Sequence, residues 1–268
     1  MDKSEVTVVL PTLNERGAIE RVIGELRGCG YSKILVVDGY STDGTADVAR
    51  ELGAEVVMQH GHGKTGAIKT AIERIDTPYM LVMDADCTYD PRDIERFLAH
   101  ADAYDEIIGY RSRENMGALH RFGNWVITKA FNLLMDTGLS DVCSGMYLLK
   151  TDFARKLNLA SRGFRTEVEI AAQAATYGRV TEVPISYRKR VGKAKLSTWR
   201  HGFEIISAVF GLARRYNPVL LFSALSALVG VPGLAILGWV LYRNLTAGVW
   251  HSGWALFGVI LLLFSCLL

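Results

Sequence analysis

The sequence predicts an α/β fold with a doubly wound, mostly parallel sheet, followed by a region that associates with a membrane. Between residues 5 and 195, short runs rich in Val and Ile alternate with runs whose apolar residues have helical spacing. This alternation is typical of the βα units that build a parallel sheet. After Asn217 charged residues almost disappear. This last part raises the hydrophobic content to 50% and the mean hydropathy to +0.17 over 268 residues.

Seven strands are expected where a β-branched or apolar run ends at a polar turn. They cover residues 6–10, 33–37, 55–58, 79–83, 106–110, 141–149 and 180–187, and the sixth includes an acidic turn, DVCSG. Pro184 places the last strand at an edge or an irregular position, because proline cannot donate a ladder hydrogen bond.

Helices are expected between these strands, where apolar residues recur every three or four positions. A long amphipathic helix is predicted over residues 119–135. Its apolar side would carry Phe122, Val126, Ile127, Ala130, Leu133 and Leu134. A capping-box pattern at residues 166–169 opens another helix, which reaches Tyr177.

The stretch 79–91, YMLVMDADCTYDP, is the strongest candidate for a site. An apolar strand runs straight into Asp84 and Asp86. Spaced i, i+2 where a strand ends, both carboxylates can turn toward one hard cation, which prefers oxygen ligands and keeps positions open for water and phosphate. Ligands of open α/β sheets bind outside the carboxyl ends of the strands. The placement suits a metal and nucleotide site, and on this stretch alone the alternative, a surface turn rich in Asp, stays open.

The change in composition predicts three regions: a soluble domain of residues 1–195, an amphipathic helix of residues 196–216 and a transmembrane region of residues 217–268. The last region holds two apolar runs, 218–242 and 249–268, and the first is long enough to cross a bilayer core of ~30 Å. Two spans in a hairpin are the simplest topology. Such helices often associate, which leaves a homo-oligomer open. The amphipathic helix is expected in the membrane interface, although a helix docked on the domain would have the same pattern.

Charge and cysteine content indicate partners and compartment. Residues 188–215 hold eight Lys and Arg residues against one acid, Glu204. A basic block beside a membrane segment indicates anionic lipid or phosphate as the partner, and not nucleic acid. Arg214 and Arg215, just before the first span, place the N-terminal domain on the cytosolic side. Four cysteines without paired spacing, and no secretory signal, agree with a cytosolic domain.

Six motifs occur in a fixed order: PTLNE, VVDGYSTDGT, GKTGA, MDADCTYDP, GYR and EVPISYRKRVGKAKL. Together they resemble the family 2 glycosyltransferases of the dolichyl-phosphate mannose synthase type, over residues 5–197. The resemblance implies a GT-A fold and Mg²⁺ or Mn²⁺ as cofactor. It also implies inverting transfer of a hexose from a nucleotide sugar, of the GDP-mannose or UDP-glucose type, to dolichyl or another polyprenyl phosphate at the cytosolic face of the membrane.

The resemblance implies roles for the residues at the motif positions. The nucleotide sugar would contact Pro11, Leu13, Glu15, Val37, Asp38, Asp84, Ala85 and Arg111. The metal would be held by Asp84, Asp86 and Thr88, with Asp86 the closer ligand. The acceptor phosphate would contact Arg111, Arg190 and Lys195. The residues expected to carry catalysis are Asp86, Arg190 and Lys195.

Three positions depart from the family pattern. The chain reads DGYS at residues 38–41 where mannose synthases often read DDGS, which leaves the choice between guanine and uracil open. Thr88 stands where they place a Gln, a stronger metal ligand. At residues 194–196 the chain reads AKL instead of SKL, so a hydroxyl is lost and the cation is kept.

An ionised phosphate acceptor needs no dedicated base, since the second pKa of a phosphate monoester is about 6. The alternative within enzymes is transfer to a sugar hydroxyl, which would need a base such as Asp141. The alternative from another class is a membrane-tethered nucleotide-sugar binding protein without turnover. A P-loop is excluded because Met58 stands where that motif needs a glycine. A dehydrogenase is excluded because the first strand does not lead into a GxGxxG turn.

Overall fold

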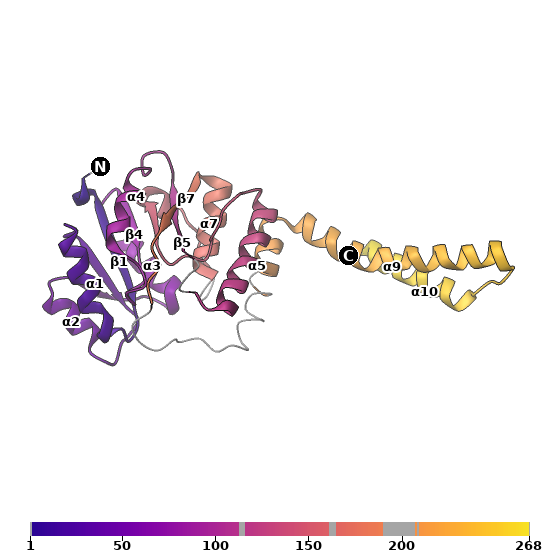
Figure 1. The fold of residues 1–268 in the computed structure, drawn as a ribbon, viewed down its shortest axis with the longest axis horizontal. Coiled ribbons are helices and arrows are strands. Elements are labelled where there is room, and N and C mark those ends of the chain that lie inside the picture. The colour runs from indigo at the N-terminus through magenta and orange to yellow at the C-terminus, as the bar shows by residue number, and fades with distance from the viewer. Residues whose placement is uncertain (1, 113–115, 161–164, 190–206, 208, 268) are drawn as a thin grey trace. The chain divides into compact units, whose positions relative to one another are not determined.

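The computed structural model describes residues 2–112, 116–160, 165–189, 207 and 209–267. The chain forms two compact units, Met1–Val209 and Phe210–Leu268 (Figure 1). The first unit contains the sheet and the second a pair of apolar helices. The domain boundaries expected at residues 195 and 216 stay predictions.

The first unit is built on a seven-stranded sheet with the strand order β3-β2-β1-β4-β6-β5-β7. The strands are β1 (Val6–Thr12), β2 (Ile34–Asp38), β3 (Glu55–Met58), β4 (Tyr79–Val82), β5 (Glu106–Arg111), β6 (Tyr147–Lys150) and β7 (Val180–Ile185). Neighbouring strands run parallel except at β6, which is antiparallel to both β4 and β5. The predicted mostly parallel sheet is confirmed, and β7, which contains Pro184, is an edge strand.

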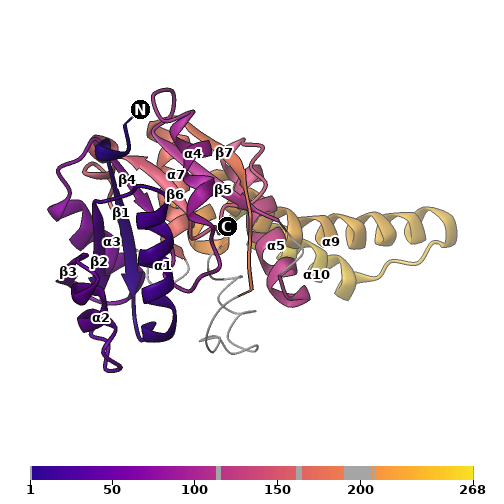
Figure 2. The same ribbon diagram turned by 60° about the vertical axis from the view of Figure 1, so that its left-hand side comes forward.

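Helices cover both faces of this sheet (Figure 2). One hydrophobic core includes residues of α1 (Arg16–Gly28), α2 (Thr45–Glu51) and α4 (Ile94–Leu98). The other includes residues of α3 (Gly63–Arg74), α6 (Thr151–Ala154) and α7 (Arg165–Tyr177). Successive residues of β1 alternate between them, since Val8 lies in the first core and Val9 in the second. Both faces being covered explains why β1 reads as a continuous apolar run.

The register brings three strand ends to one edge of the sheet. Thr12 of β1 lies beside Asp38 of β2, and Val9 lies beside Val82 of β4. Because these strands are parallel, the loops that follow them leave the sheet on the same side. The first two loops also bind each other, since Asn14 Oδ1 accepts a hydrogen bond of 2.8 Å from a backbone N–H of the second.

Helix α5 (Ala118–Met135) matches the long helix expected here, and its predicted apolar side is only partly covered. Phe131 and Thr128 are buried, whereas Phe122 and Leu133 are exposed. The spacing of apolar residues had placed Phe122 and Leu133 together on one apolar side. The other four residues of that side are half-buried: Val126, Ile127, Ala130 and Leu134.

The second unit is a helical hairpin of α9 (Pro218–Ala247) and α10 (Ser252–Leu267). α9 continues five residues past position 242, where the first span was expected to end. It is long and apolar enough to cross a membrane, while α10 is a shorter apolar helix. Of the amphipathic helix expected at 196–216, residues 207 and 209–216 are described and are helical; the rest lies outside the described residues.

Small residues allow the two helices to approach closely. Ser226 Oγ donates to the backbone oxygen of Ser265 at 2.7 Å, and Ser265 Oγ donates back to the oxygen of Ser226 at 2.9 Å. A Cβ at Gly258 would lie 2.8 Å from Leu237 Cγ. Lipid tails are as apolar as the helices of a membrane protein, so the hydrophobic effect does not drive such helices together. Hydrogen bonds and close packing of this kind hold them together instead.

Gly109 of β5 offers a test of the packing between the sheet and α4. A Cβ there would lie 2.6 Å from Ile185 Cδ1 and 2.8 Å from Phe97 Cζ, so Gly109→Ala overpacks the core. We expect it to lower the free energy of unfolding by about 1–3 kcal/mol. Thermal unfolding of the full chain in detergent measures the effect. Gly24→Ala on α1 is the control: its Cβ meets nothing within 4 Å, so its midpoint should not fall.

Candidate active site

Asp38 ends β2 and is fully buried. Its Oδ2 accepts a hydrogen bond of 2.7 Å from the backbone N–H of Ser41, and its Oδ1 accepts one of 3.3 Å from Thr12 Oγ1. The carboxylate therefore closes its own turn and ties it to β1. Pro11 and Val37 lie beside each other in the same register, so the expected nucleotide-binding residues at these strand ends come together.

Two large side chains are exposed on the linked loops after β1 and β2. Leu13 is 46% exposed and Tyr40 is 60% exposed. Tyr40 has a φ of 66°, which is unusual for a bulky residue, and its hydroxyl donates to the backbone oxygen of Gln59 at 3.2 Å. Glu15 lies at the start of α1, where its backbone N–H donates to Thr45 Oγ1 at 3.0 Å. Tyr40 was not singled out from the sequence, although the DGYS departure marks its position.

The acidic pair follows β4, as predicted, with Ala85 buried between its members. Asp84 rests against Gly145, where any Cβ would overlap its carboxylate. Asp86 Oδ1 accepts hydrogen bonds from the backbone N–H of Thr88 at 3.1 Å and from Thr88 Oγ1 at 2.5 Å. The hydroxyl of Thr88, expected as a metal ligand, thus donates a hydrogen bond to Asp86.

A lysine from α3 joins two carboxylates at this place. Lys64 Nζ lies 2.5 Å from Asp84 Oδ1 and 2.5 Å from Glu167 Oε1 of α7. Burial raises the pKa of Glu167, and its Oε2 has no hydrogen-bond partner. Burial also opposes the charge on Lys64, but the two carboxylates raise its pKa well above the usual value. Sequence reasoning missed Glu167; the only signals were a GKTG motif and a capping-box pattern more than 100 residues apart.

Arg111 and Asp141 form a buried ion pair. Arg111 Nε donates to Asp141 Oδ2 at 2.6 Å and Nη2 donates to Oδ1 at 2.9 Å, with a further bond of 3.0 Å to the backbone oxygen of Cys143. Both side chains are more than nine-tenths buried. The guanidinium expected to contact phosphates is therefore directed at Asp141, and both oxygens of Asp141 are engaged.

A cavity of about 340 Å³ lies beside this pair. Arg111 and Asp141 form part of its wall, together with Arg121 and Trp125 of α5. The remaining wall is contributed by Tyr110, Ser112, Met116, Asn124 and Ser140. The wall thus combines two guanidinium groups with one exposed indole, which suits a ligand that has an anionic and an apolar part. Arg190 and Lys195, the other expected phosphate ligands, lie outside the described residues.

The oxygen atoms of Asp84 and Asp86 suit a hard divalent cation. Within the described parts of the chain, no group of three or more His, Cys, Asp and Glu side chains could hold a metal ion by itself. A cation here would take its remaining ligands from a bound diphosphate and from water, which is the usual situation for Mg²⁺. The residues present fit a cation that is shared with a phosphate ligand.

Known structures share this fold. The crystal structure of mannosyl-3-phosphoglycerate synthase from Rubrobacter xylanophilus has a TM-score of 0.67 and 20% identity, covering 80% of this chain and 75% of that one. Glucosyl-3-phosphoglycerate synthase from Mycobacterium tuberculosis, in complex with Mn²⁺, UDP-glucose and phosphoglyceric acid, has a TM-score of 0.63 and 18% identity, covering 77% and 79%. At such identity they show the fold alone, and they confirm the predicted GT-A fold.

Sequence relatives are closer. Glycosyltransferase AglJ of Haloferax volcanii is 34% identical over 98% of this chain and 92% of its own length. Dolichyl-phosphate hexose transferase of the same organism is 31% identical, covering 75% of this chain and 90% of its own. Undecaprenyl-phosphate mannosyltransferase of Micrococcus luteus is 28% identical, covering 79% and 96%. The resemblance to polyprenyl-phosphate glycosyltransferases is thereby confirmed. Because residues 7–157 also match the family described as glycosyl transferase family 2, the chain belongs to that family.

Proposed function

We propose that the protein transfers a hexose from a nucleotide sugar to a polyprenyl phosphate, with inversion at the anomeric carbon. The observation that carries the proposal is the acidic pair Asp84 and Asp86, which follows β4 at the sheet edge where β2 ends in Asp38, with Asp84 packed against Gly145. Relatives named for dolichyl-phosphate and undecaprenyl-phosphate transfer support the acceptor class. The donor is of the GDP-mannose or UDP-glucose type.

The donor would lie along the ends of β1, β2 and β4. Leu13 and Tyr40 offer exposed apolar surface for the base, and Asp38 fixes the turn that carries Tyr40. Asp84 and Asp86 would hold Mg²⁺ or Mn²⁺ against the diphosphate. When bound, the cation neutralises charge that develops on the leaving nucleoside diphosphate.

The acceptor would lie in the cavity beside Arg111. Arg121 can bind the charge of its phosphate, and Trp125 offers surface for the first isoprene units. Arg111 would join Arg121 only by sharing its guanidinium with Asp141. Arg190 and Lys195 are expected to complete this set. Since the phosphate is already ionised near neutral pH, the chain needs only to orient it toward the anomeric carbon.

The membrane region fits an acceptor that stays in the bilayer. α9 crosses the membrane in this proposal, and α10 returns as the second span of a multi-pass anchor with the catalytic unit on the cytosolic side. Membrane lipids would then surround the hairpin, and contacts between hairpins could join a homo-oligomer.

Transfer to a sugar hydroxyl is the second candidate, and a non-catalytic nucleotide-sugar binding protein is the third. A hydroxyl acceptor needs a general base, and Asp141 was the residue considered for it. Both oxygens of Asp141 accept hydrogen bonds from Arg111, which supports a positioning role for this carboxylate over proton abstraction.

The first test is turnover. The full chain is incubated with a panel of nucleotide sugars, Mn²⁺ or Mg²⁺ and a short polyprenyl phosphate, and the lipid product is identified by mass. We expect a lipid-linked monosaccharide and free nucleoside diphosphate, and Asp86→Ala should lower the rate by about 100-fold or more, because it removes the cation's ligand. Asp76→Asn, an exposed Asp just before β4, is the control. Normal turnover by Asp86→Ala would contradict the metal assignment, and binding without any turnover would favour the third candidate.

Asp141→Asn separates the first two candidates. Loss of a general base typically costs ~10²–10⁴-fold in rate. With a phosphate acceptor we expect a loss below about 100-fold, expressed mainly as a higher KM for the lipid, because only the support of Arg111 is weakened. Initial rates at varied lipid phosphate measure this split. A kcat near zero at saturating lipid would favour the hydroxyl acceptor.

Lys64→Met tests the lysine between the two carboxylates. The variant leaves Asp84 and Glu167 close together without their shared cation. We expect the free energy of unfolding to fall by about 2 kcal/mol, less than for a fully enclosed pair, because Asp84 is partly exposed. Thermal unfolding measures the change, and Lys69→Met, on the exposed side of the same helix, is the control. Equal thermal midpoints for the two variants would show that the Lys64 ion pairs make no net contribution to stability.

A further inference from the structure

The loop of residues 86–90, which follows β4, is held in an unfavourable backbone conformation. Cys87 has a φ of 65°, in the left-handed region that side chains with a Cβ rarely adopt. Its Sγ is buried and donates to the backbone oxygen of Ala18 at 3.6 Å. Strained residues persist only where surrounding contacts determine the conformation, and they gather at functional sites. Contacts with other segments must therefore fix the conformation of this loop beside Asp86.

The chain just after β7 lies against this loop and makes some of these contacts. Arg188 N donates to the backbone oxygen of Thr88 at 2.7 Å. Tyr89 and Tyr187 form an isolated antiparallel bridge, and their rings pack edge to face with centroids 5.6 Å apart. The N–H and hydroxyl of Thr88 donate hydrogen bonds to Asp86. Thr88 therefore connects the backbone of Arg188 to the Asp86 carboxylate.

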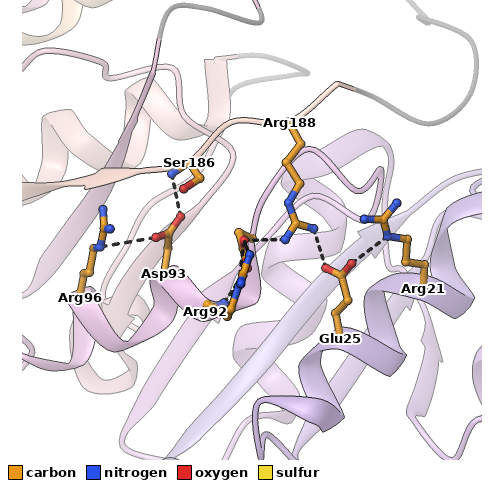
Figure 3. Close-up of polar contacts among 8 residues, drawn as sticks. Arg21, Glu25, Arg92, Asp93, Arg96, Ser186 and Arg188 are labelled. Atoms are coloured by element: carbon orange, nitrogen blue, oxygen red, sulfur yellow. Dashed lines mark hydrogen bonds and ion pairs between the residues drawn. The ribbon is translucent and has the colours of Figure 1, made fainter.

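The Arg188 side chain makes two ion pairs that also fix the loop (Figure 3). Its Nη2 lies 2.5 Å from Asp90 Oδ2, at the end of the loop, and its Nη1 lies 2.7 Å from Glu25 Oε2 on α1. The guanidinium is about three-quarters buried. One side chain thus joins the loop, a helix and the chain after the edge strand.

Two other arginines bind the same carboxylates without joining different elements. Arg92 contacts Asp90, two residues away, and Arg21 contacts Glu25 from the same helix (Figure 3). Both are far more exposed than Arg188, at 77% and 58%. They provide controls that remove one arginine from the cluster and leave the connection between elements intact.

We propose that Arg188 is a positioning residue that fixes the loop of residues 86–90, and with it the Asp86 carboxylate, in the geometry that binds a divalent cation. Its backbone N–H acts on Thr88 and its guanidinium acts on Asp90 and Glu25, so a side-chain substitution removes the second connection and leaves the first. The proposal rests on the proposed function, which assigns a cation to Asp86. Outer contacts of this kind commonly change metal affinity by ~10–100-fold when they are lost.

The experiment measures Mn²⁺ affinity and does not depend on turnover. The dissociation constant of Mn²⁺ for the full chain in detergent is determined from the electron paramagnetic resonance signal of free Mn²⁺, with a nucleoside diphosphate present. We expect Arg188→Gln to weaken Mn²⁺ binding by about 10-fold or more. Arg92→Gln and Arg21→Gln should stay within about twofold of the parent chain, since exposed ion pairs contribute little.

A second set of variants separates positioning from general stability. Arg188→Lys keeps one charge contact and should lose less affinity than Arg188→Gln. Cys87→Gly combined with Arg188→Gln should recover part of the lost Mn²⁺ affinity, because glycine adopts a positive φ without steric strain. A merely structural role for Arg188 predicts lower thermal midpoints with unchanged Mn²⁺ affinity and no recovery.

The outcomes distinguish this inference from the proposed function. If the parent chain binds Mn²⁺ and Arg188→Gln binds it equally well, the positioning role is wrong and the proposed function is untouched. If the affinities differ as expected but no sugar is transferred, the positioning role stands and the proposed function fails. If the parent chain binds no Mn²⁺, or if Arg188→Gln and Arg188→Lys both fail to fold, the assignment of a positioning role is overturned.

Discussion

The accumulation of negative charge at one edge of the sheet is the constraint on which the site depends. Asp84, Asp90 and Asp141 all lie at this edge or in the loops that leave it, and each is held by a Lys or Arg from a different element. The cations come from α3, from the end of β5 and from the chain after β7. Carboxylates that are removed from water need such partners, because an uncompensated buried charge is costly. The same pairs fix the positions of the side chains that a phosphate ligand would meet.

The sequence predicted the architecture because local patterns determine it. Runs of β-branched or apolar residues placed all seven strands, and residues 55–58 matched β3 residue for residue. Asp84 and Asp86 could be placed because a carboxylate at the end of a buried strand has no packing role, whatever the rest of the fold does. Pro184 indicated an edge strand for an equally local reason, the missing N–H.

The partners of these residues could not be predicted, because pairing is set by contacts between distant segments. Lys64 and Glu167 are joined across the sheet edge, and neither has a neighbour in sequence that signals the other. Arg188 was counted with a basic block expected to attract phosphate, yet its guanidinium is bound to Glu25 and Asp90. The exposure of Phe122 and Leu133 on α5 was missed for a related reason, since spacing shows where apolar residues lie along a helix and not which of them the domain covers.

The reversed direction of β6 has a consequence for how such enzymes diversify. Since β5 ends and β6 begins at the same edge, the chain that connects them is an excursion that leaves the sheet and returns to it at one place. This excursion contains Asp141 and most of the cavity wall, but none of the residues at the ends of β1 and β2. In the proposed function this excursion would hold the acceptor, and the ends of β1 and β2 would hold the donor. A change in the length or composition of the excursion would then leave the donor side in place.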